Sequence, residues 1–281
     1  MTTSAQQTKT RFEPTEIAPE TFLVHDHSGE GRDPVTIGLN TMVIRAAEPV
    51  VVDTGMAEHR DQYLDDVFSL VEPEDIRWVF ISHDDVDHTG NVNALLELAP
   101  NATLVLDWFM QERMGGSLAV PPTRWRWLQD GDGLFVGDRT LQLVRPPVFD
   151  SPTTRGLYDP TTGVYWGVDA FAAPMPPVPV RSVEELPDLG GWLEGIHTFA
   201  QYVSPWLSLV ERGRYQETVD RIELLAPRVL AGCHTPVIEG SYVAEAIGAT
   251  RTAPWATVAP QPDQSVLDAI VAALDPAAAA A

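Results

Sequence analysis

The chain has 281 residues and is strongly acidic, with 18 Lys and Arg against 40 Asp and Glu and a formal net charge of −22 at pH 7. A surface this negative repels phosphate backbones and anionic lipids, so the composition argues against nucleic acid or a membrane as a partner. The single cysteine, Cys233, excludes an intrachain disulfide and a cysteine-rich iron cluster. Any metal must therefore be held by histidine and carboxylate, and Cys233 is expected to be a small buried residue at a strand end.

No apolar run reaches the roughly 18 residues that a membrane span needs, and residues 1–10 lack the apolar segment of a signal peptide. We therefore expect a soluble, cytoplasmic protein. The length fits one domain. The predicted division is a flexible leader at 1–18, a single domain at 19–275 and a fraying alanine tail at 276–281.

Short apolar runs and helical spacing alternate along the chain. In the first half, strands are predicted at 20–24, 35–44, 49–55, 76–81 and 102–106, and helices at 59–71, 92–98 and 107–114. In the second half, the pattern predicts a hairpin at 134–144, a strand at 226–234 and helices at 241–249 and 263–274. This alternation is typical of layered α/β architecture.

The predicted strand at 76–81 ends in a segment that offers two imidazoles and several carboxylates within six residues: His83, Asp85, Asp87 and His88. A strand that stops at such a cluster can present metal ligands at its carboxyl end. The spacing allows a tight loop to direct two ligands at one ion and two at a neighbour, which favours a two-metal centre. The alternative is a polar loop in which Asp87 or Thr89 caps the next helix, although capping does not need two histidines.

Three segments resemble the successive signatures of the metallo-β-lactamase superfamily: Asn40–Ile44, Val50–Gly55 and Ile81–Gly90. Its hydrolases usually read H-x-H-x-D-H in the loop, whereas this chain reads H-x-D-x-D-H. That pattern is similar to the H-x-E-x-D-H of flavodiiron proteins and stand-alone oxygen-binding diiron proteins. The resemblance implies a four-layer αββα sandwich, with a strand at 164–169 and paired helices at 195–225. It also implies that Asp53 supports the metal loop (Ile81–Gly90) without binding the metal itself. Because hard oxygen donors favour iron or manganese over zinc, the resemblance further implies reaction with dioxygen in place of hydrolysis.

The same resemblance implies a complete ligand set. One metal would be held by His83, Asp85 and Asp150, the other by Asp87, His88 and His234, with Asp169 as the bridge. The family has a histidine where this chain has Asp150, so two alternatives stay open: His25 or His27 completes the first site, or that site is weak. Tyr202 is a candidate hydrogen-bond donor near bound oxygen.

The implied cofactor is a pair of iron ions, with manganese or zinc as alternatives. The implied activity is binding or activation of dioxygen or nitric oxide, as an oxidase, oxygenase or reductase. Flavodiiron proteins continue into a flavodoxin-like domain where this chain stops, so the resemblance implies a separate flavoprotein or rubredoxin-like electron donor, and a homodimer by analogy. Two other functions stay open: a zinc or mixed-metal hydrolase acting on an ester, thioester or lactone, and a non-enzymatic oxygen sensor.

Overall fold

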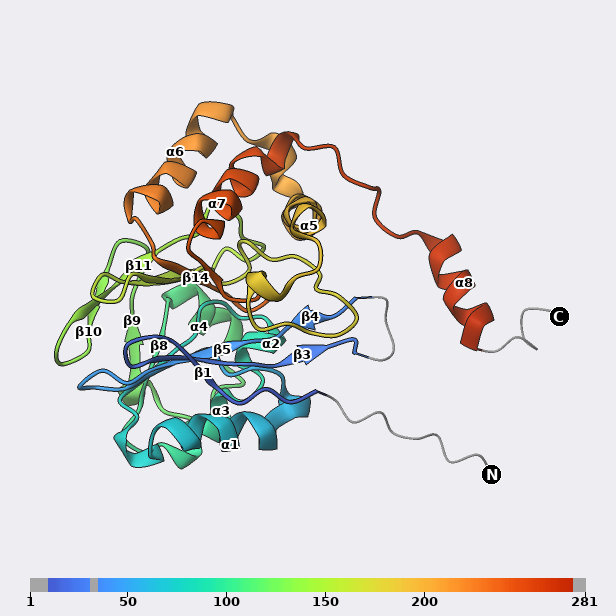
Figure 1. Ribbon diagram of the computed structural model, residues 1–281. Helices are drawn as coiled ribbons and strands as arrows, with labels where there is room; N and C mark the ends of the chain where they lie inside the picture. Colours follow the sequence, from blue (N-terminus) through green and yellow to red (C-terminus); the bar gives the residue numbers. More distant parts are fainter. Residues whose placement is uncertain (1–9, 31–34, 275–281) are drawn as a thin grey trace, which may run out of the picture.

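A computed structural model describes residues 10–30 and 35–274, and its strands form two large sheets stacked face to face (Figure 1). Among these residues the first sheet has the order β1-β2-β5-β6-β7-β8-β9. Its strands are Thr15–Ala18, Thr21–Val24, Thr41–Ile44, Val50–Val52, Trp78–Phe80, Thr103–Leu106 and Trp125–Trp127. The second sheet has the order β10 to β15, with strands Gly133–Phe135, Thr140–Val144, Gly156–Asp159, Val164–Trp166, Val229–Ala231 and Ile238–Glu239. A short pair, β3 (His27–Ser28) and β4 (Ile37–Gly38), lies outside both.

Helices cover the outer face of each sheet (Figure 1). The first sheet carries α1 (Arg60–Leu70), α3 (Val92–Leu98) and α4 (Trp108–Met114), and the second carries α5 (Leu189–Val203), α6 (Arg212–Leu224) and α7 (Tyr242–Thr252). The short α2 (Val86–Thr89) follows β7, and α8 (Gln264–Leu274) stands apart from the sandwich (Figure 1). Short 3₁₀ turns occur at Ala57–His59, Pro73–Asp75, Pro122–Arg124, Val183–Glu185, Pro205–Leu209 and Ala253–Trp255. No helix in the described part of the chain is long and apolar enough to cross a bilayer.

Side-chain alternation along the strands divides the core into three apolar layers. On β5, Met42 and Ile44 point into the layer between the sheets, whereas Val43 packs with the helices of the first sheet. On β13, Trp166 belongs to the layer between the sheets and Tyr165 to the layer under α5, α6 and α7. The predicted four-layer αββα sandwich is therefore confirmed.

Parallel pairing brings distant segments to one edge of the sandwich. Strands β6, β7 and β8 run parallel, so the segments after β6 and β7, including Asp53 and the metal loop, leave the sheet side by side. Strands β13 and β14 are also parallel, which brings Asp169 and His234, each three residues beyond its strand, to the same end of the second sheet. Ligands at the carboxyl ends of adjacent parallel strands meet at one place.

Two expectations differ from the structure. The leader boundary is wrong, because Thr15–Ala18 is strand β1, antiparallel to β2, and Arg11 Nη2 lies 2.6 Å from Asp66 Oδ1. Residues 1–9 and the predicted alanine tail lie outside the described residues. The helix predicted at 263–274 exists as α8, but its apolar side is not packed, since Leu267 and Ile270 are about half exposed. The limits of a single domain at 19–275 stay a prediction.

Candidate metal centre

The first group of candidate ligands is formed by His83, Asp85 and Asp150, whose ligand atoms all lie within 4.8 Å of one another. His83 Nε2 lies 3.7 Å from Asp85 Oδ2 and 3.8 Å from Asp150 Oδ1. His83 is fully buried, whereas the Asp85 and Asp150 side chains are 47% and 24% exposed. The two carboxylates therefore form the solvent-facing side of the centre.

A second group lies deeper. Asp87 Oδ2 is 3.5 Å from His88 Nε2 and 3.2 Å from His234 Nε2. Both histidines belong to one cluster of mutually close ligand atoms together with Asp87 and Cys233. Asp87 and His88 come from the metal loop and helix α2, and His234 follows β14 in the other sheet. The two halves of the sandwich thus contribute to one group.

Asp169 lies between the two groups and presents one oxygen to each. Its Oδ2 is 3.3 Å from His83 Nε2, and its Oδ1 is 3.2 Å from His88 Nε2 and 3.4 Å from His234 Nε2. The preceding residue, Val168, has φ 62°. A β-branched side chain is rare in this left-handed region, and such strain of about 1–3 kcal/mol persists only where the surroundings fix the backbone. This geometry suits a carboxylate that bridges two ions.

Buried partners hold the imidazoles in one orientation. Asp53 is fully buried, and its carboxylate accepts hydrogen bonds from the Ser82 amide (2.7 Å) and hydroxyl (2.7 Å), from His88 Nδ1 (2.9 Å) and from Trp166 Nε1 (3.0 Å). His234 Nδ1 donates to the Gly38 carbonyl at 2.7 Å. With the protons on Nδ1, the lone pairs on Nε2 of His88 and His234 face the centre, as in metal-binding histidines. The supporting role expected for Asp53 matches these contacts.

Three buried atoms show that the centre fits cations. Among the described residues, His83 Nε2, His88 Nε2 and Asp169 Oδ1 have no hydrogen-bond partner. An unsatisfied buried polar atom costs about 1–3 kcal/mol, so three of them in one place need an explanation. Around a shared ion, ligand atoms at about 2.0–2.2 Å from the metal lie roughly 3 Å or slightly more apart. The spacings of 3.2 to 3.8 Å described above are close to this arrangement.

The shifted pKa values of the candidate ligands also indicate a site that binds cations. Burial disfavours a charged Asp169, but His83, His88 and His234 outweigh burial and hold its pKa well below the ordinary value. Burial and the neighbouring His88 lower the pKa of His83, but Asp169 and Asp85 outweigh them and raise it to about 9. In the metal-free centre the carboxylates thus draw protons onto imidazoles. Divalent cations would displace these protons, because imidazole binds metals in its neutral form.

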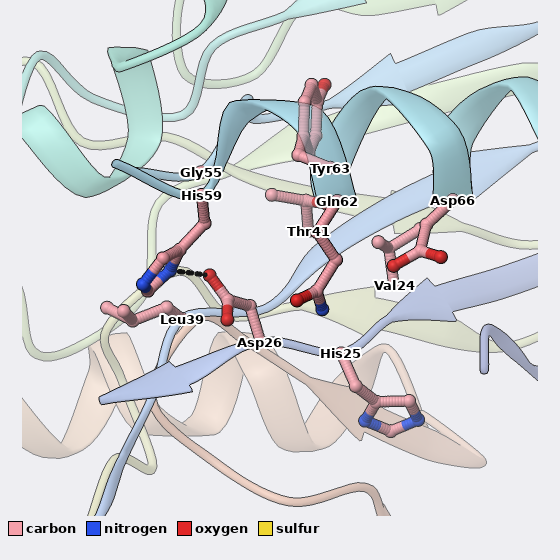
Figure 2. Close-up of a pocket in the computed structure, with 10 residues that line it drawn as sticks. All are labelled: Val24, His25, Asp26, Leu39, Thr41, Gly55, His59, Gln62, Tyr63 and Asp66. Atoms are coloured by element: carbon pink, nitrogen blue, oxygen red, sulfur yellow. Dashed lines mark hydrogen bonds and ion pairs between the residues drawn. The ribbon is translucent and has the colours of Figure 1, made fainter. Parts of the chain in front are cut away.

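The structure brings all seven predicted ligand positions together: His83, Asp85, Asp87, His88, Asp150, Asp169 and His234. The alternative in which His25 or His27 completes the first site is wrong. His25 Nε2 lies 3.0 Å from Thr15 Oγ1, and His27 Nε2 lies 2.9 Å from Glu30 Oε2. Figure 2 shows His25 at a small pocket beside α1, with its ring directed away from the paired side chains of Asp26 and His59.

Two other interpretations are also corrected. The Tyr202 hydroxyl donates to the carbonyls of Ala259 and Pro260 at 2.9 and 2.8 Å, so it is not available to a ligand at the centre. The ring that faces His234 is that of Phe199, one turn earlier on α5, with a centroid distance of 5.5 Å. The capping alternative also fails, since neither α2 nor α3 has a side-chain hydrogen bond at its N-cap.

Sequence reasoning missed Asp84, which lies inside the metal loop but points away from the ligands. Its carboxylate accepts hydrogen bonds from the hydroxyls of Ser151 (2.9 Å) and Thr153 (2.8 Å), and it pairs with Arg113 on α4. Asp84 therefore ties the metal loop to the segment that carries Asp150. Its position beside His83 was visible in the sequence, but its partners come from distant segments.

Comparison with known proteins identifies the family and the fold. A family model described as "ODP family beta lactamase" matches residues 38–228. A putative diflavin flavoprotein A 2 from Nostoc is 31% identical over 173 residues, which cover 59% of this chain and 30% of the relative. An anaerobic nitric oxide reductase flavorubredoxin from Vibrio vulnificus is 24% identical over 133 residues, covering 47% of this chain and 27% of the relative. The chain thus spans under a third of either relative.

Among solved structures, the flavodiiron protein from Giardia intestinalis superposes with a TM-score of 0.71 at 16% identity, covering 87% of this chain and 60% of that one. This likeness supports the fold. The family match includes β5 to β13, the metal loop and six of the seven candidate ligands, all except His234. On these grounds the chain belongs to the ODP family of beta lactamases.

Proposed function

We propose that this chain is a non-heme diiron oxidoreductase that acts on dioxygen or nitric oxide and receives electrons from a separate protein. The observation that carries the proposal is the position of Asp169, one buried carboxylate with an oxygen directed at each of two ligand groups. The two groups and Asp169 together contain four carboxylates and three imidazoles, and such a hard, anionic set favours iron or manganese over zinc. The names of the relatives from Nostoc and Vibrio are consistent with redox chemistry.

The chain's own residues have distinct tasks in this proposal. His83, Asp85 and Asp150 would hold the first ion, Asp87, His88 and His234 the second, and Asp169 both. Two ferrous ions so placed would supply one electron each to a diatomic substrate. Asp53 and the Gly38 carbonyl fix the imidazoles, so that the ligands need no rearrangement when metal binds.

The exposure of the individual ligands indicates from which side a substrate would reach the metal centre. The exposed sides of Asp85 and Asp150 mark the face from which a small substrate would enter. His88 and Asp169 are buried beneath these two carboxylates, and the half-buried ring of Phe199 packs beside His234. Burial of His88 and Asp169 would limit the access of water to the inner ligands.

The electron donor would be a flavoprotein or a rubredoxin-like protein. This part of the proposal rests on the names of two relatives, a diflavin flavoprotein and a flavorubredoxin, and the present chain matches under a third of each. A homodimer and a cytoplasmic location stay predictions.

Metal analysis tests the proposal. Protein expressed separately in iron- and zinc-supplemented media would be purified without air, and its metal content and its near-ultraviolet spectrum would be recorded before and after exposure to air. The two ligand groups predict two irons per chain and a band that appears on oxidation. Preferential retention of zinc in both media, together with hydrolysis of an ester or lactone, would replace the proposal with a metallohydrolase. Iron that stays bound but neither oxidises nor consumes dioxygen or nitric oxide would also exclude it.

A further inference from the structure

The only cysteine of the chain lies beside the second ligand group. Cys233 is fully buried, and its Sγ is 3.6 Å from Asp87 Oδ2. The sulfur belongs to a set of four ligand atoms that all lie within 4.8 Å of one another. The other three are a carboxylate oxygen of Asp87 and one ring nitrogen each of His88 and His234. Burial in the layer between the sheets explains the apolar contacts of this residue, and donation of the thiol to Asp87 Oδ2 explains the carboxylate, but neither explains why the sulfur also lies within 4.8 Å of two imidazole nitrogens.

The backbone fixes the sulfur in this position. Residues 233 and 234 form a turn, so neighbouring side chains that would diverge in a strand both reach Asp87 Oδ2, at 3.6 Å for Cys233 Sγ and 3.2 Å for His234 Nε2. The Cys233 amide donates to the Val168 carbonyl at 2.9 Å, and its carbonyl accepts from the Asn40 amide at 3.0 Å. Gly232 permits this close packing, because a Cβ there would lie 2.6 Å from the Val168 carbonyl oxygen.

A second observation in the same group points to a ligand. His88 Nε2 is fully buried and has no hydrogen-bond partner among the described residues, although it belongs to the set that contains Cys233 Sγ. Its Nδ1 is already bound by Asp53, so Nε2 is left facing the space between Asp87, Cys233 and His234. Two imidazoles, a carboxylate and a sulfur surround this space, and Asp169 Oδ1 lies beside both imidazoles, at 3.2 Å from His88 Nε2 and 3.4 Å from His234 Nε2. All of these are donors that bind metal ions in proteins.

We propose that Cys233 binds the second metal as a thiolate, together with Asp87, His88 and His234. The inference deepens the proposed function and rests on it, because it requires an ion in the second group. On binding, the S–H bond breaks, a sulfur–metal bond forms and the proton leaves to solvent, with no change in oxidation state.

The consequence is a chemical difference between the two positions. The first group offers one imidazole and two carboxylates, whereas the second adds a soft thiolate to two imidazoles and one carboxylate. A thiolate disfavours manganese at the second position, so the preference for hard ions applies to the carboxylate-rich first position. The second position is therefore expected to retain its ion when a hard-ion competitor or a mild chelator empties the first.

Cobalt provides a direct test, because a cobalt–thiolate bond absorbs in the near ultraviolet and this chain has one thiol. The metal-free full chain would be titrated with Co²⁺ while bound cobalt is counted. We expect the band in the wild type, its loss in Cys233→Ser with weaker binding of one of the two ions by roughly 10–100-fold, and its retention in His83→Ala, which affects the first group. X-ray absorption of the cobalt-loaded wild type should show one sulfur at about 2.3 Å, a readout that needs no variant to fold.

The outcomes separate this inference from the function on which it rests. Two bound cobalt ions without the band and without a sulfur neighbour would overturn thiolate ligation and leave the diiron proposal standing. Failure of the wild type to bind two ions would overturn the diiron proposal. A band that survives Cys233→Ser would assign the absorption to another group and would also refute the inference.

Discussion

Asp53 and His88 are joined by a 2.9 Å hydrogen bond between two side chains that are both fully buried. The contact links the end of β6 to helix α2, and the same carboxylate also binds Ser82 in the metal loop and Trp166 on β13. One aspartate thus connects both sheets directly behind the candidate ligands. It also fixes the proton of His88 on Nδ1, which leaves Nε2 for a metal.

Replacing this carboxylate should weaken the centre without removing a ligand. All four groups bound to the Asp53 carboxylate are hydrogen-bond donors. In Asp53→Asn, an amide nitrogen, itself a donor, would replace one acceptor oxygen and face at least one of these donors. We expect metal affinity to fall by about 10–100-fold and the free energy of unfolding to fall by about 1–3 kcal/mol. Competition with a chromophoric chelator and urea unfolding would measure the two effects. Asp65→Asn, on the exposed side of α1, serves as the control, and equal affinities for both variants would contradict the prediction.

The sequence predicts most of this centre because the decisive ligands are local. His83 to His88 lie in one loop, and a strand before it fixes where the loop leaves the sheet. Asp169 and His234 could be placed only by resemblance, since nothing local in the sequence tells which strands become neighbours. The layers were predictable from alternation, as in β5, where Val43 and its neighbours Met42 and Ile44 face opposite sides.

The predictions for Tyr202, strand β1 and Cys233 failed or were incomplete because they depend on tertiary packing, which local sequence does not specify. Tyr202 and Phe199 lie on the same helix, and which of them faces the centre depends on how α5 packs on the second sheet, a tertiary fact. Strand β1 has no fully buried residue; it is held by backbone pairing with β2 and by partly buried Ile17 and Ala18, and two apolar residues in a row are too short a run to predict a strand. Cys233 looks like a core residue in sequence, and it does lie in the core. Only the turn at 233–234 reveals that its sulfur meets Asp87.

Asp150 decides whether the first position is a full metal site. Removing its carboxylate in Asp150→Ala leaves His83 and Asp85 as the non-bridging ligands, so we expect metal content after dialysis to fall from two ions per chain towards one. Asp150→His, which restores the residue found in the resembling family, should retain both ions. Elemental analysis would measure the content, with Asp138→Ala at the exposed hairpin turn as the control. If content and occupancy are unchanged in Asp150→Ala, Asp150 is not a ligand.

Arg155 is a buried residue whose guanidinium binds the backbone at the start of the metal loop. It is fully buried and donates through Nη1 to the Leu128 carbonyl at 2.7 Å and through Nη2 to the Ile81 carbonyl at 2.6 Å. Arg155→Met would leave both carbonyls without these donors. At about 1–3 kcal/mol for each unsatisfied group, we expect the free energy of unfolding to fall by about 2–6 kcal/mol.

Chemical denaturation of the metal-free protein would measure this loss. Arg155→Lys should recover only part of it, because a single ammonium cannot reproduce the planar fork that reaches two carbonyls. The control is Arg221→Met, whose side chain is 48% exposed and pairs with Asp130. An exposed pair of this kind contributes at most about 1 kcal/mol. Equal losses in Arg155→Met and Arg221→Met would show that the buried guanidinium has no special role.

Because the pKa of His25 is lowered in the folded chain, we expect the free energy of unfolding to depend on pH. The side chain is 5% exposed, and burial, with a smaller contribution from Arg181, lowers the pKa of His25 to about 4. In the unfolded chain the pKa returns to about 6.5. Between these values the unfolded chain binds a proton that the folded chain does not. The contribution of His25 to stability is therefore fully present above about pH 6.5 and is lost as the pH falls towards 4, by up to about 3 kcal/mol.

His25→Gln removes this titration and keeps a polar group that can contact Thr15 Oγ1. Between pH 7 and 4.5, the free energy of unfolding of the wild type should therefore fall by about 2 kcal/mol more than that of the variant. Urea unfolding of the metal-free proteins would give both values, and histidines at the metal centre cancel because they titrate in both. His197→Gln removes a half-buried histidine on α5 that contacts Thr252, and it should follow the wild type. Parallel stability curves for the wild type and His25→Gln would mean that His25 takes up its proton without unfolding, and that burial does not control its pKa.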